Sequence, residues 1–251
     1  MDEFVGKVAL ITGAGRGLGR EIALAFSSLG AIVAANDINP INLDETVSQI
    51  KRVGGNASGY VFDIAKRMPI EGMVAQVLEH CNHIDILINH ASVEPDASVL
   101  DMDEWEFHRT LDVNLGGPFF CTQQVGRVMR QQGGGAIVNI LSVSRRRNAP
   151  KGRAAHLASQ FGLLGLTQAA AHELSEYNIR LNAVCHGTLE LEHISPYIFD
   201  LSALHKWRES APNLRLGNHP DLVSLVLFLC SDAASSLIGQ VLSLPPELDA
   251  E

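Results

Sequence analysis

Short apolar runs alternate with amphipathic segments along the whole chain. Continuous apolar runs are typical of buried strands in a parallel sheet, whereas apolar positions three and four residues apart mark one face of a helix. We expect strands at 7–13, 31–38, 57–64, 84–91, 134–142, 179–187 and 240–244. We expect helices at 19–30, 42–54, 69–81, 102–132, 152–176 and 220–231. This alternation predicts an α/β protein whose parallel sheet is covered by helices on both faces.

Nothing along the chain marks a domain boundary. The 251 residues contain no linker-like or low-complexity stretch and no internal repeat. Hydrophobic residues make up 46% of the chain, which is enough to bury a sizeable core. We therefore expect residues 1–251 to form a single domain.

Charge and cysteine content narrow the setting in which the protein works. The formal net charge of −9 argues against a nucleic-acid partner. No run approaches the roughly 20 apolar residues that a membrane span needs, and the acidic first residues run directly into a strand, so we expect neither a membrane anchor nor a signal peptide. The four cysteines are far apart and form no C-x-x-C pair, as in a cytoplasmic protein with reduced thiols.

The turn between the first strand and the first helix carries a glycine motif. It reads TGAGRGLG at 12–19 and places Gly13, Gly17 and Gly19 in the spacing T-G-x-x-x-G-x-G. Glycines let the backbone turn tightly and approach a pyrophosphate, and the following helix offers amide donors and the positive end of its dipole. Because the motif follows a strand and opens a helix, it predicts dinucleotide binding. The alternative is a merely tight turn.

Carboxylates at two strand ends bear on which dinucleotide is bound. Asp37 closes the second strand, where it can bond both hydroxyls of the adenosine ribose and would repel a 2′-phosphate, which favours NAD over NADP. Arg16 in the turn favours NADP, because a cation can pair with a 2′-phosphate, but Asp37 is given the greater weight. Asp63 ends the third strand and can either bond the adenine amino group or cap the strand end.

Further motifs extend over nearly the whole chain. They are TGAGRGLG (12–19), DI (63–64), LINHA (87–91), VNLGGPFFCTQ (113–123), IVNILSVS (137–144), FGLLGLTQAAAHEL (161–174), NIRLNAV (178–184) and LIGQVLSL (237–244). Together they resemble the short-chain dehydrogenase/reductase family. The resemblance implies a Rossmann-like, doubly wound parallel sheet of about seven strands. It also implies reversible hydride transfer between a nicotinamide and an alcohol or carbonyl of a small molecule.

Site residues follow from the same resemblance. The family uses a tyrosine, a lysine four residues later, a serine and an asparagine. By position, Asn114 is the asparagine and Ser142 the serine, but His156 stands for the tyrosine and Gln160 for the lysine. The implied cofactor-binding residues are Gly13, Arg16, Gly17, Leu18, Gly19, Asp37, Asp63, Ile64, Asn89, Ala91, Gln160, His186 and Gly187. No metal ligand is implied.

Other departures from the family pattern fall at places that normally touch cofactor or substrate. The family's N-N-A-G is NHAS at 89–92, its Pro-Gly is His186-Gly187, and its C-terminal DGG-like segment is PPE at 245–247. Departures concentrated there, on an otherwise ordinary scaffold, indicate changed function more than random decay.

A histidine at the tyrosine position would not need the lysine. A phenol near pKa 10 needs a neighbouring cation to lower its pKa, whereas imidazole titrates near pH 6.5 unaided. Gln160 carries no charge but can still bond ribose hydroxyls. His156 is thus a candidate acid and base, or alternatively it fills space, because the shorter imidazole misplaces the reacting atoms. We expect Ser142 to bond the substrate oxygen and Asn114 to bend its helix and hold a water.

Three functions remain open at this point. The first is an NAD-dependent oxidoreductase with altered catalytic residues, and the second is an NAD-binding sensor or partner subunit that has lost hydride chemistry. The third is a zinc site built from the histidines at 90, 156 and 186. In relatives, the helices matching 102–132 and 152–176 pair between subunits, so we expect a homodimer or homotetramer. The segment at about 188–216 is expected to form a substrate lid.

Overall fold

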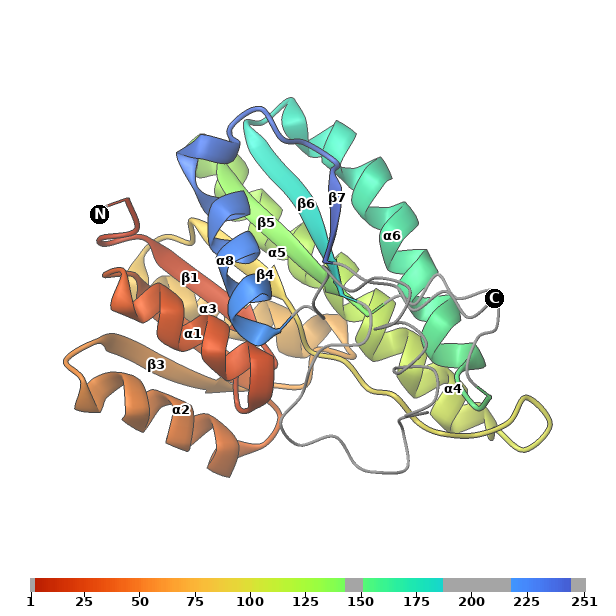
Figure 1. Cartoon of the computed structure of the whole chain (residues 1–251). Coiled ribbons are helices and arrows are strands. Elements are labelled where there is room, and N and C mark those ends of the chain that lie inside the picture. The colour runs from red at the N-terminus through yellow and green to blue at the C-terminus, as the bar shows by residue number, and fades with distance from the viewer. Residues whose placement is uncertain (1–2, 143–150, 187–217, 245–251) are drawn as a thin grey trace, which may run out of the picture.

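Seven parallel strands form one sheet in the computed structural model, which describes residues 3–142, 151–186 and 218–244 (Figure 1). The strands are β1 Val8–Thr12, β2 Ile32–Asp37, β3 Asn56–Val61, β4 Ile86–Asn89, β5 Gly135–Leu141, β6 Ile179–His186 and β7 Val241–Leu244. Their order is β3-β2-β1-β4-β5-β6-β7, and every neighbouring pair is parallel. The doubly wound, Rossmann-like sheet predicted from the sequence is thus confirmed.

Helices cover both faces of this sheet (Figure 1). They are α1 Gly17–Ser28, α2 Pro40–Arg52, α3 Arg67–Cys81, α4 Glu104–Leu111, α5 Gly117–Gln132, α6 Ala154–Ser175 and α8 His219–Cys230. Helices α1, α2 and α8 pack into one buried hydrophobic cluster with the sheet, and α3, α5 and α6 pack into another. No helix in the described part of the chain is long and apolar enough to cross a membrane.

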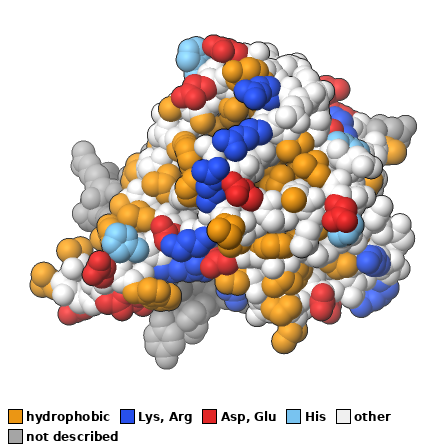
Figure 2. Space-filling view, turned by 180° about the vertical axis from the view of Figure 1, so that it is seen from behind, with side chains coloured by type: hydrophobic (Ala, Val, Ile, Leu, Met, Phe, Trp, Pro, Cys, Tyr) orange, Lys and Arg blue, Asp and Glu red, His pale blue; other side chains and the backbone are white. Residues whose placement is uncertain are grey.

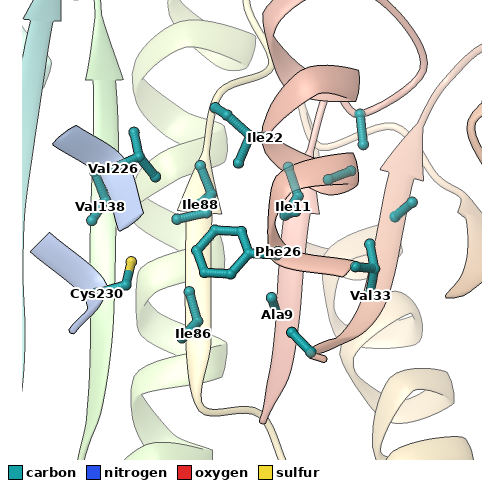
Figure 3. Close-up of a cluster of buried hydrophobic side chains, with 14 of the residues drawn as sticks. Ala9, Ile11, Ile22, Phe26, Val33, Ile86, Ile88, Val138, Val226 and Cys230 are labelled. Atoms are coloured by element: carbon teal, nitrogen blue, oxygen red, sulfur yellow. The ribbon is translucent and has the colours of Figure 1, made fainter. Parts of the chain in front are cut away.

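Alternation along each strand explains the two clusters. In β1, Ala9 and Ile11 belong to the cluster under α1 and α8, whereas Val8 and Leu10 belong to the cluster under α3 and α5. Successive side chains of a strand point to opposite faces, so a strand buried on both faces must be apolar throughout. Figure 3 shows the Phe26 ring of α1 over β1 and β4. Burying such a side chain completely stabilises the fold by about 1.5–3 kcal/mol.

Element boundaries differ from the expected ones by a few residues, and two differences bear on the site. The third strand ends at Val61, so Asp63 lies two residues beyond it rather than closing it. The helix expected over 102–132 is divided into α4, a π-helical turn η1 at Asp112–Gly116, and α5. Pro118 lies in the first turn of α5 and has no N–H to donate, so the regular hydrogen-bond pattern is interrupted there.

The strand order reverses between β1 and β4, and this reversal positions the candidate site. In open α/β sheets, ligands bind in the crevice outside the carboxyl ends of the strands at such a switch point. The glycine-rich turn follows β1 there, and the sequence NHAS follows β4. Gly187, the expected lid at about 188–216 and PPE at 245–247 lie outside the described residues.

Candidate active site

In the glycine-rich turn, the glycines occupy positions where a side chain would be strained or would collide with neighbouring atoms. Gly13 has φ +69°, and a Cβ atom there would lie 2.8 Å from the Ala91 Cα atom. Gly17, the first residue of α1, has φ +52°, and a Cβ atom on Gly19 would collide with the Gly13 carbonyl oxygen. Glycine adopts positive φ freely and permits close backbone approach. Each predicted glycine therefore has a local reason, and the start of α1 offers the dipole and amides that a phosphate needs.

Side chains that the sequence analysis missed hold this turn in place. The Arg20 Nε donates to the Gly15 carbonyl at 3.1 Å and to the Thr46 hydroxyl at 2.9 Å. The Thr12 hydroxyl accepts the His90 N–H at 3.0 Å and so ties the end of β1 to the end of β4. The local signals are weak: Arg20 follows the last glycine of the motif, and Thr12 opens it.

A cavity of about 450 Å³ lies beside the turn and is large enough for part of a dinucleotide. Its lining includes predicted cofactor-binding residues, namely Gly13, Arg16, Gly17, Leu18, Asp37, Asp63, Ile64 and Ala91. These residues come from the turn after β1 and the start of α1, from the end of β2 and from the segments after β3 and β4. The structure thus brings together residues that are up to 78 positions apart in the sequence, from Gly13 to Ala91.

Asp37 closes β2 and fixes the shape of the cavity mouth. One carboxylate oxygen accepts the Gly15 N–H at 2.9 Å, and the other accepts the Asn39 N–H at 2.9 Å. Arg16 lines the same cavity and is exposed. The Asp37 carboxylate and the exposed Arg16 side chain therefore belong to the lining of one cavity.

Asp63 is engaged by protein groups at the other end of this cavity. Its Oδ1 accepts the Ala65 N–H at 3.0 Å, and its Oδ2 pairs with the Arg109 guanidinium at 2.7 Å. Burial raises the pKa of this carboxyl, but the Arg109 and Ala65 hydrogen bonds outweigh burial, so the net shift is downward. The carboxylate caps the chain after β3, which was one of the two alternatives, and it remains ionised at the cavity wall.

A second cavity, of about 680 Å³, adjoins the first. Both linings contain Arg16, His90, Ser92, Val93 and Arg109. The second lining also contains Ser142 at the end of β5, His156 of α6 and His186 at the end of β6. The predicted catalytic serine and histidine therefore line one cavity, and this cavity shares wall residues with the candidate dinucleotide cavity.

His156 is almost fully buried, with 4% of its side chain exposed. Its Nδ1 lies 3.4 Å from both the Val93 carbonyl oxygen and the Asn114 amide nitrogen. Its Nε2 has no hydrogen-bond partner among the described residues and lies 3.7 Å from the Glu94 carboxylate. One ring nitrogen is thus held by the scaffold, whereas the other is buried and has no hydrogen-bond partner among the described residues.

Asn114 lies in the π-helical turn and clamps the segment that follows β4. Its Oδ1 accepts the Val93 N–H at 2.8 Å, and its Nδ2 donates to the Val93 carbonyl at 2.9 Å and to the Ser159 hydroxyl at 3.0 Å. The side chain therefore joins three elements at once. This agrees with a structural part for Asn114 at an irregular helix, although the groups it holds are protein groups.

Four of the described site residues predicted from the sequence line neither cavity, namely Gly19, Asn89, Asn114 and Gln160. Gln160 is 2% exposed, and its Oε1 accepts the Ser142 N–H at 2.8 Å. This hydrogen bond holds the backbone of the serine in place. Asn89 is also buried, and its Nδ2 donates to Asn139 at 2.8 Å and to Thr122 at 3.3 Å. Asn89 thus bonds α5 and the sheet rather than the crevice.

His90 replaces a family asparagine and has an unusual environment. Its Nδ1 is buried without a hydrogen-bond partner among the described residues, and its ring lies against Gly19. Burial, together with the nearby His186 and His219 imidazoles, lowers the pKa of His90 to about 4. His90 is therefore neutral at pH 7, and the residue lies in the lining of both cavities.

The zinc alternative has no support in the described part of the chain. Within residues 3–142, 151–186 and 218–244, no three His, Cys, Asp or Glu side chains come close enough to hold a metal ion. His90, His156 and His186 share one cavity lining but form no such group.

Comparison with known proteins assigns the family. The model of a family described as enoyl-(acyl carrier protein) reductase matches residues 13–244. The chain is 37% identical to the 3-oxoacyl-(acyl-carrier-protein) reductase FabG of Thermotoga maritima over 95% of this chain and 96% of that protein. The protein belongs to the short-chain dehydrogenase/reductase family. Its relatives are NAD(P)-dependent oxidoreductases that act on small molecules.

Solved structures agree with this assignment. A Sinorhizobium meliloti protein described as a short-chain alcohol dehydrogenase is 33% identical, with a TM-score of 0.87 over 98% of this chain and 96% of that chain. A 7α-hydroxysteroid dehydrogenase in complex with NADH and a 7-oxo bile acid is 31% identical, with a TM-score of 0.86 over 96% and 93% of the two chains. The second structure shows that a relative binds a nicotinamide cofactor on this fold.

Proposed function

We propose that the protein is an NAD-dependent oxidoreductase that interconverts an alcohol and a carbonyl of a small molecule, with His156 as acid and base. The observation that carries this proposal is the shared cavity. A buried imidazole with an unbonded Nε2 and the half-buried Ser142 line a space that adjoins the candidate dinucleotide cavity. Proton transfer and hydride transfer need such adjoining spaces.

The described residues fit a nicotinamide dinucleotide. The turn at 13–19 suits a pyrophosphate, because Gly13 and Gly19 permit a close backbone approach and Gly17 has a positive φ at the start of α1. Asp37 suits the two ribose hydroxyls of NAD and would repel the 2′-phosphate of NADP, which is why we favour NAD despite Arg16. When bound, the nicotinamide supplies or accepts the hydride.

The chain's own residues then handle the substrate oxygen. Ser142 donates its hydroxyl proton to that oxygen as a hydrogen bond, and His156 transfers a proton to it during reduction or removes one during oxidation. Gln160 bonds the Ser142 backbone N–H and so fixes where the hydroxyl stands. Asn114 holds Val93, whose carbonyl oxygen faces the His156 Nδ1. These assignments replace the family's tyrosine and lysine with an imidazole and a neutral amide that supports Ser142.

A second function, an inactive NAD-binding sensor or partner subunit, is favoured by one observation. The His156 Nε2 has almost no accessible surface, and Gln160 already uses its carbonyl on Ser142. A substrate oxygen would therefore need the segment after β4 to shift before it could reach the imidazole. Binding without turnover would establish this alternative.

We further propose that the protein is a cytoplasmic homodimer or homotetramer. All four cysteines are free thiols, and three of them are buried, which suits a reducing compartment.

A groove of about 240 Å³ runs between α5 and α6, with Phe119, Leu166 and Tyr177 in its lining. In the view from behind, hydrophobic side chains lie among charged ones of both signs (Figure 2). Such a mixed face suits a protein surface better than a nucleic acid.

Turnover is tested with a panel of alcohols with NAD and ketones with NADH, the purified protein and a His156→Phe variant. We expect the native protein to turn over at least one pair and the variant to lose activity on the order of 10²-fold or more while still binding NADH. NADH binding without any turnover in the native protein would favour the sensor. Undiminished turnover in His156→Phe would remove the histidine from the mechanism.

A further inference from the structure

A carboxylate that belongs to none of the family motifs faces the candidate catalytic imidazole. Glu94 Oε1 lies 3.7 Å from the His156 Nε2, and the same carboxylate oxygen lies 2.9 Å from the Arg153 guanidinium. All three side chains lie at one place, where the segment after β4 meets the start of α6. Glu94 and His156 also line the same 680 Å³ cavity.

The backbone around Glu94 is held on both sides, so this juxtaposition is built into the fold. Val93 is bonded through both its N–H and its carbonyl by the Asn114 side chain. On the other side, the Ala97 N–H donates to the Gly152 carbonyl at 3.3 Å, and Arg153 reaches the Glu94 carbonyl at 3.4 Å. The segment 93–97 therefore lies against the residues that begin α6, and Glu94 is fixed opposite the imidazole.

We propose that Glu94 is the charge partner of His156 and replaces the missing lysine with a charge of the opposite sign. A tyrosine becomes an anion when it loses its proton, so a cation assists it. An imidazole is a cation when it holds its proton, so an anion assists it. With histidine in place of tyrosine, the neighbouring residue that assists proton transfer must therefore carry a negative charge instead of a positive one. Glu94 supplies that sign, and Gln160 supplies none.

The distance between the Glu94 carboxylate and the His156 Nε2 also suits a charge partner. At 3.7 Å the carboxylate is too far away to accept a good hydrogen bond from Nε2, but close enough for a substantial charge interaction. The Nε2 proton is therefore favoured by Glu94 without being bound to it. Other charged groups in the cavity lining are Arg16, Glu106, Arg109 and His186, and Arg109 is already paired with Asp63.

The consequence for catalysis rests on the proposed function. During carbonyl reduction, the imidazolium N–H bond breaks and its proton forms the new O–H bond, while the hydride from the nicotinamide forms the new C–H bond. His156 is left neutral and is reprotonated from solvent, which reaches the half-exposed Glu94 carboxylate beside it. Glu94 is a positioning and charge-setting residue, since it acts on the substrate only through His156.

The test measures the His156 protonation state directly, in the protein without cofactor or substrate. The ring nitrogens of ¹⁵N-labelled histidine report the ratio of imidazolium to neutral imidazole, and the His156→Phe variant assigns the signal. We expect Glu94→Gln to lower that ratio for His156 roughly 3- to 10-fold at fixed pH, because a half-exposed, arginine-paired carboxylate acts at the weak end of the usual range. Glu94→Asp should restore much of the ratio.

A matched control is present on the surface. Glu104 lies 3.8 Å from the His108 imidazole in α4, and both side chains are exposed. Glu104→Gln should leave the His156 ratio unchanged and should change that of His108 only slightly, because exposed pairs are screened by water. A His156 ratio that is unchanged in Glu94→Gln overturns the proposal, whatever the activity of the protein.

Kinetics add a second readout if turnover is observed. In Glu94→Gln, the rate of carbonyl reduction should fall off at a lower pH than in the native protein, with KM little changed. If no substrate is turned over but the His156 ratio still responds to Glu94→Gln, the charge partnership stands and the oxidoreductase proposal fails. The two proposals therefore fail by different results.

Discussion

The Gln160 side chain is buried and is already bonded to a neighbouring backbone group. It is 2% exposed, and its carbonyl oxygen already accepts the Ser142 N–H. A lysine ammonium has no acceptor to offer this N–H, and burying an unpaired charge is costly. The neutral amide is therefore consistent with the local packing, and in our proposal the charged partner of His156 is Glu94.

His90 gives the protein a pH-dependent stability with a defined sign. Its folded-state pKa of about 4 lies below the ordinary value near 6.5, so protons bind the unfolded chain more tightly. The stability contributed by neutral His90 is complete above pH 6.5 and is lost as the pH falls toward 4. Between pH 7 and pH 4 the free energy of unfolding falls in both proteins. Urea unfolding should show that this fall is smaller by about 2–3 kcal/mol in His90→Asn than in the native protein.

The exposed His172 of α6 provides the control for this measurement. His172→Asn should show the same loss of unfolding free energy between pH 7 and pH 4 as the native protein. Equal losses in His90→Asn and the native protein would show that His90 is not held neutral by its surroundings.

At the scale of elements, the glycine turn is the part whose conformation the sequence predicts most directly. Gly19→Ala would place a methyl group against the Gly13 carbonyl and the His90 ring. We expect it to weaken NADH binding by on the order of 10²-fold or more and to destabilise the fold by about 1–3 kcal/mol, as overpacking does. Calorimetric titration and urea unfolding measure the two effects.

Gly72→Ala in α3 is the matched change, because a Cβ atom there would be 3.4 Å from the Phe62 ring, an ordinary contact. It should leave NADH binding intact and stabilise the fold by about 0.5–1 kcal/mol. Equal NADH affinity in the two variants would argue against a cofactor on this turn.

The contrast between predicted and missed parts follows from sequence separation. Strands, helices and the glycine turn depend on neighbouring residues, so the apolar pattern and the glycine spacing predict them. Partners such as Glu94 for His156 and Arg109 for Asp63 are 62 and 46 residues apart, and no local pattern joins them. The π-helical turn at 112–116 was also missed, because Pro118 interrupts the helix without ending it.

At the scale of the whole molecule, the groove between α5 and α6 is the proposed contact between subunits. Phe119 lines it and is 43% exposed, so Phe119→Glu removes little packing within one chain but would bury a charge in an interface. Sedimentation velocity should show a dimer or tetramer for the native protein and a smaller species for this variant. Ile41→Glu on α2, 78% exposed and outside the groove, should leave the assembly unchanged.

A nicotinamide dinucleotide across the carboxyl edge of the sheet underlies both functions considered for this protein. The cavity between the glycine turn, Asp37 and Ala91 has the size and backbone geometry for it. Calorimetric titration of the purified protein with NAD, NADH, NADP and NADPH tests this most directly. The account predicts saturable binding of NAD or NADH, tighter than that of the phosphorylated forms. Absence of binding for all four would contradict it.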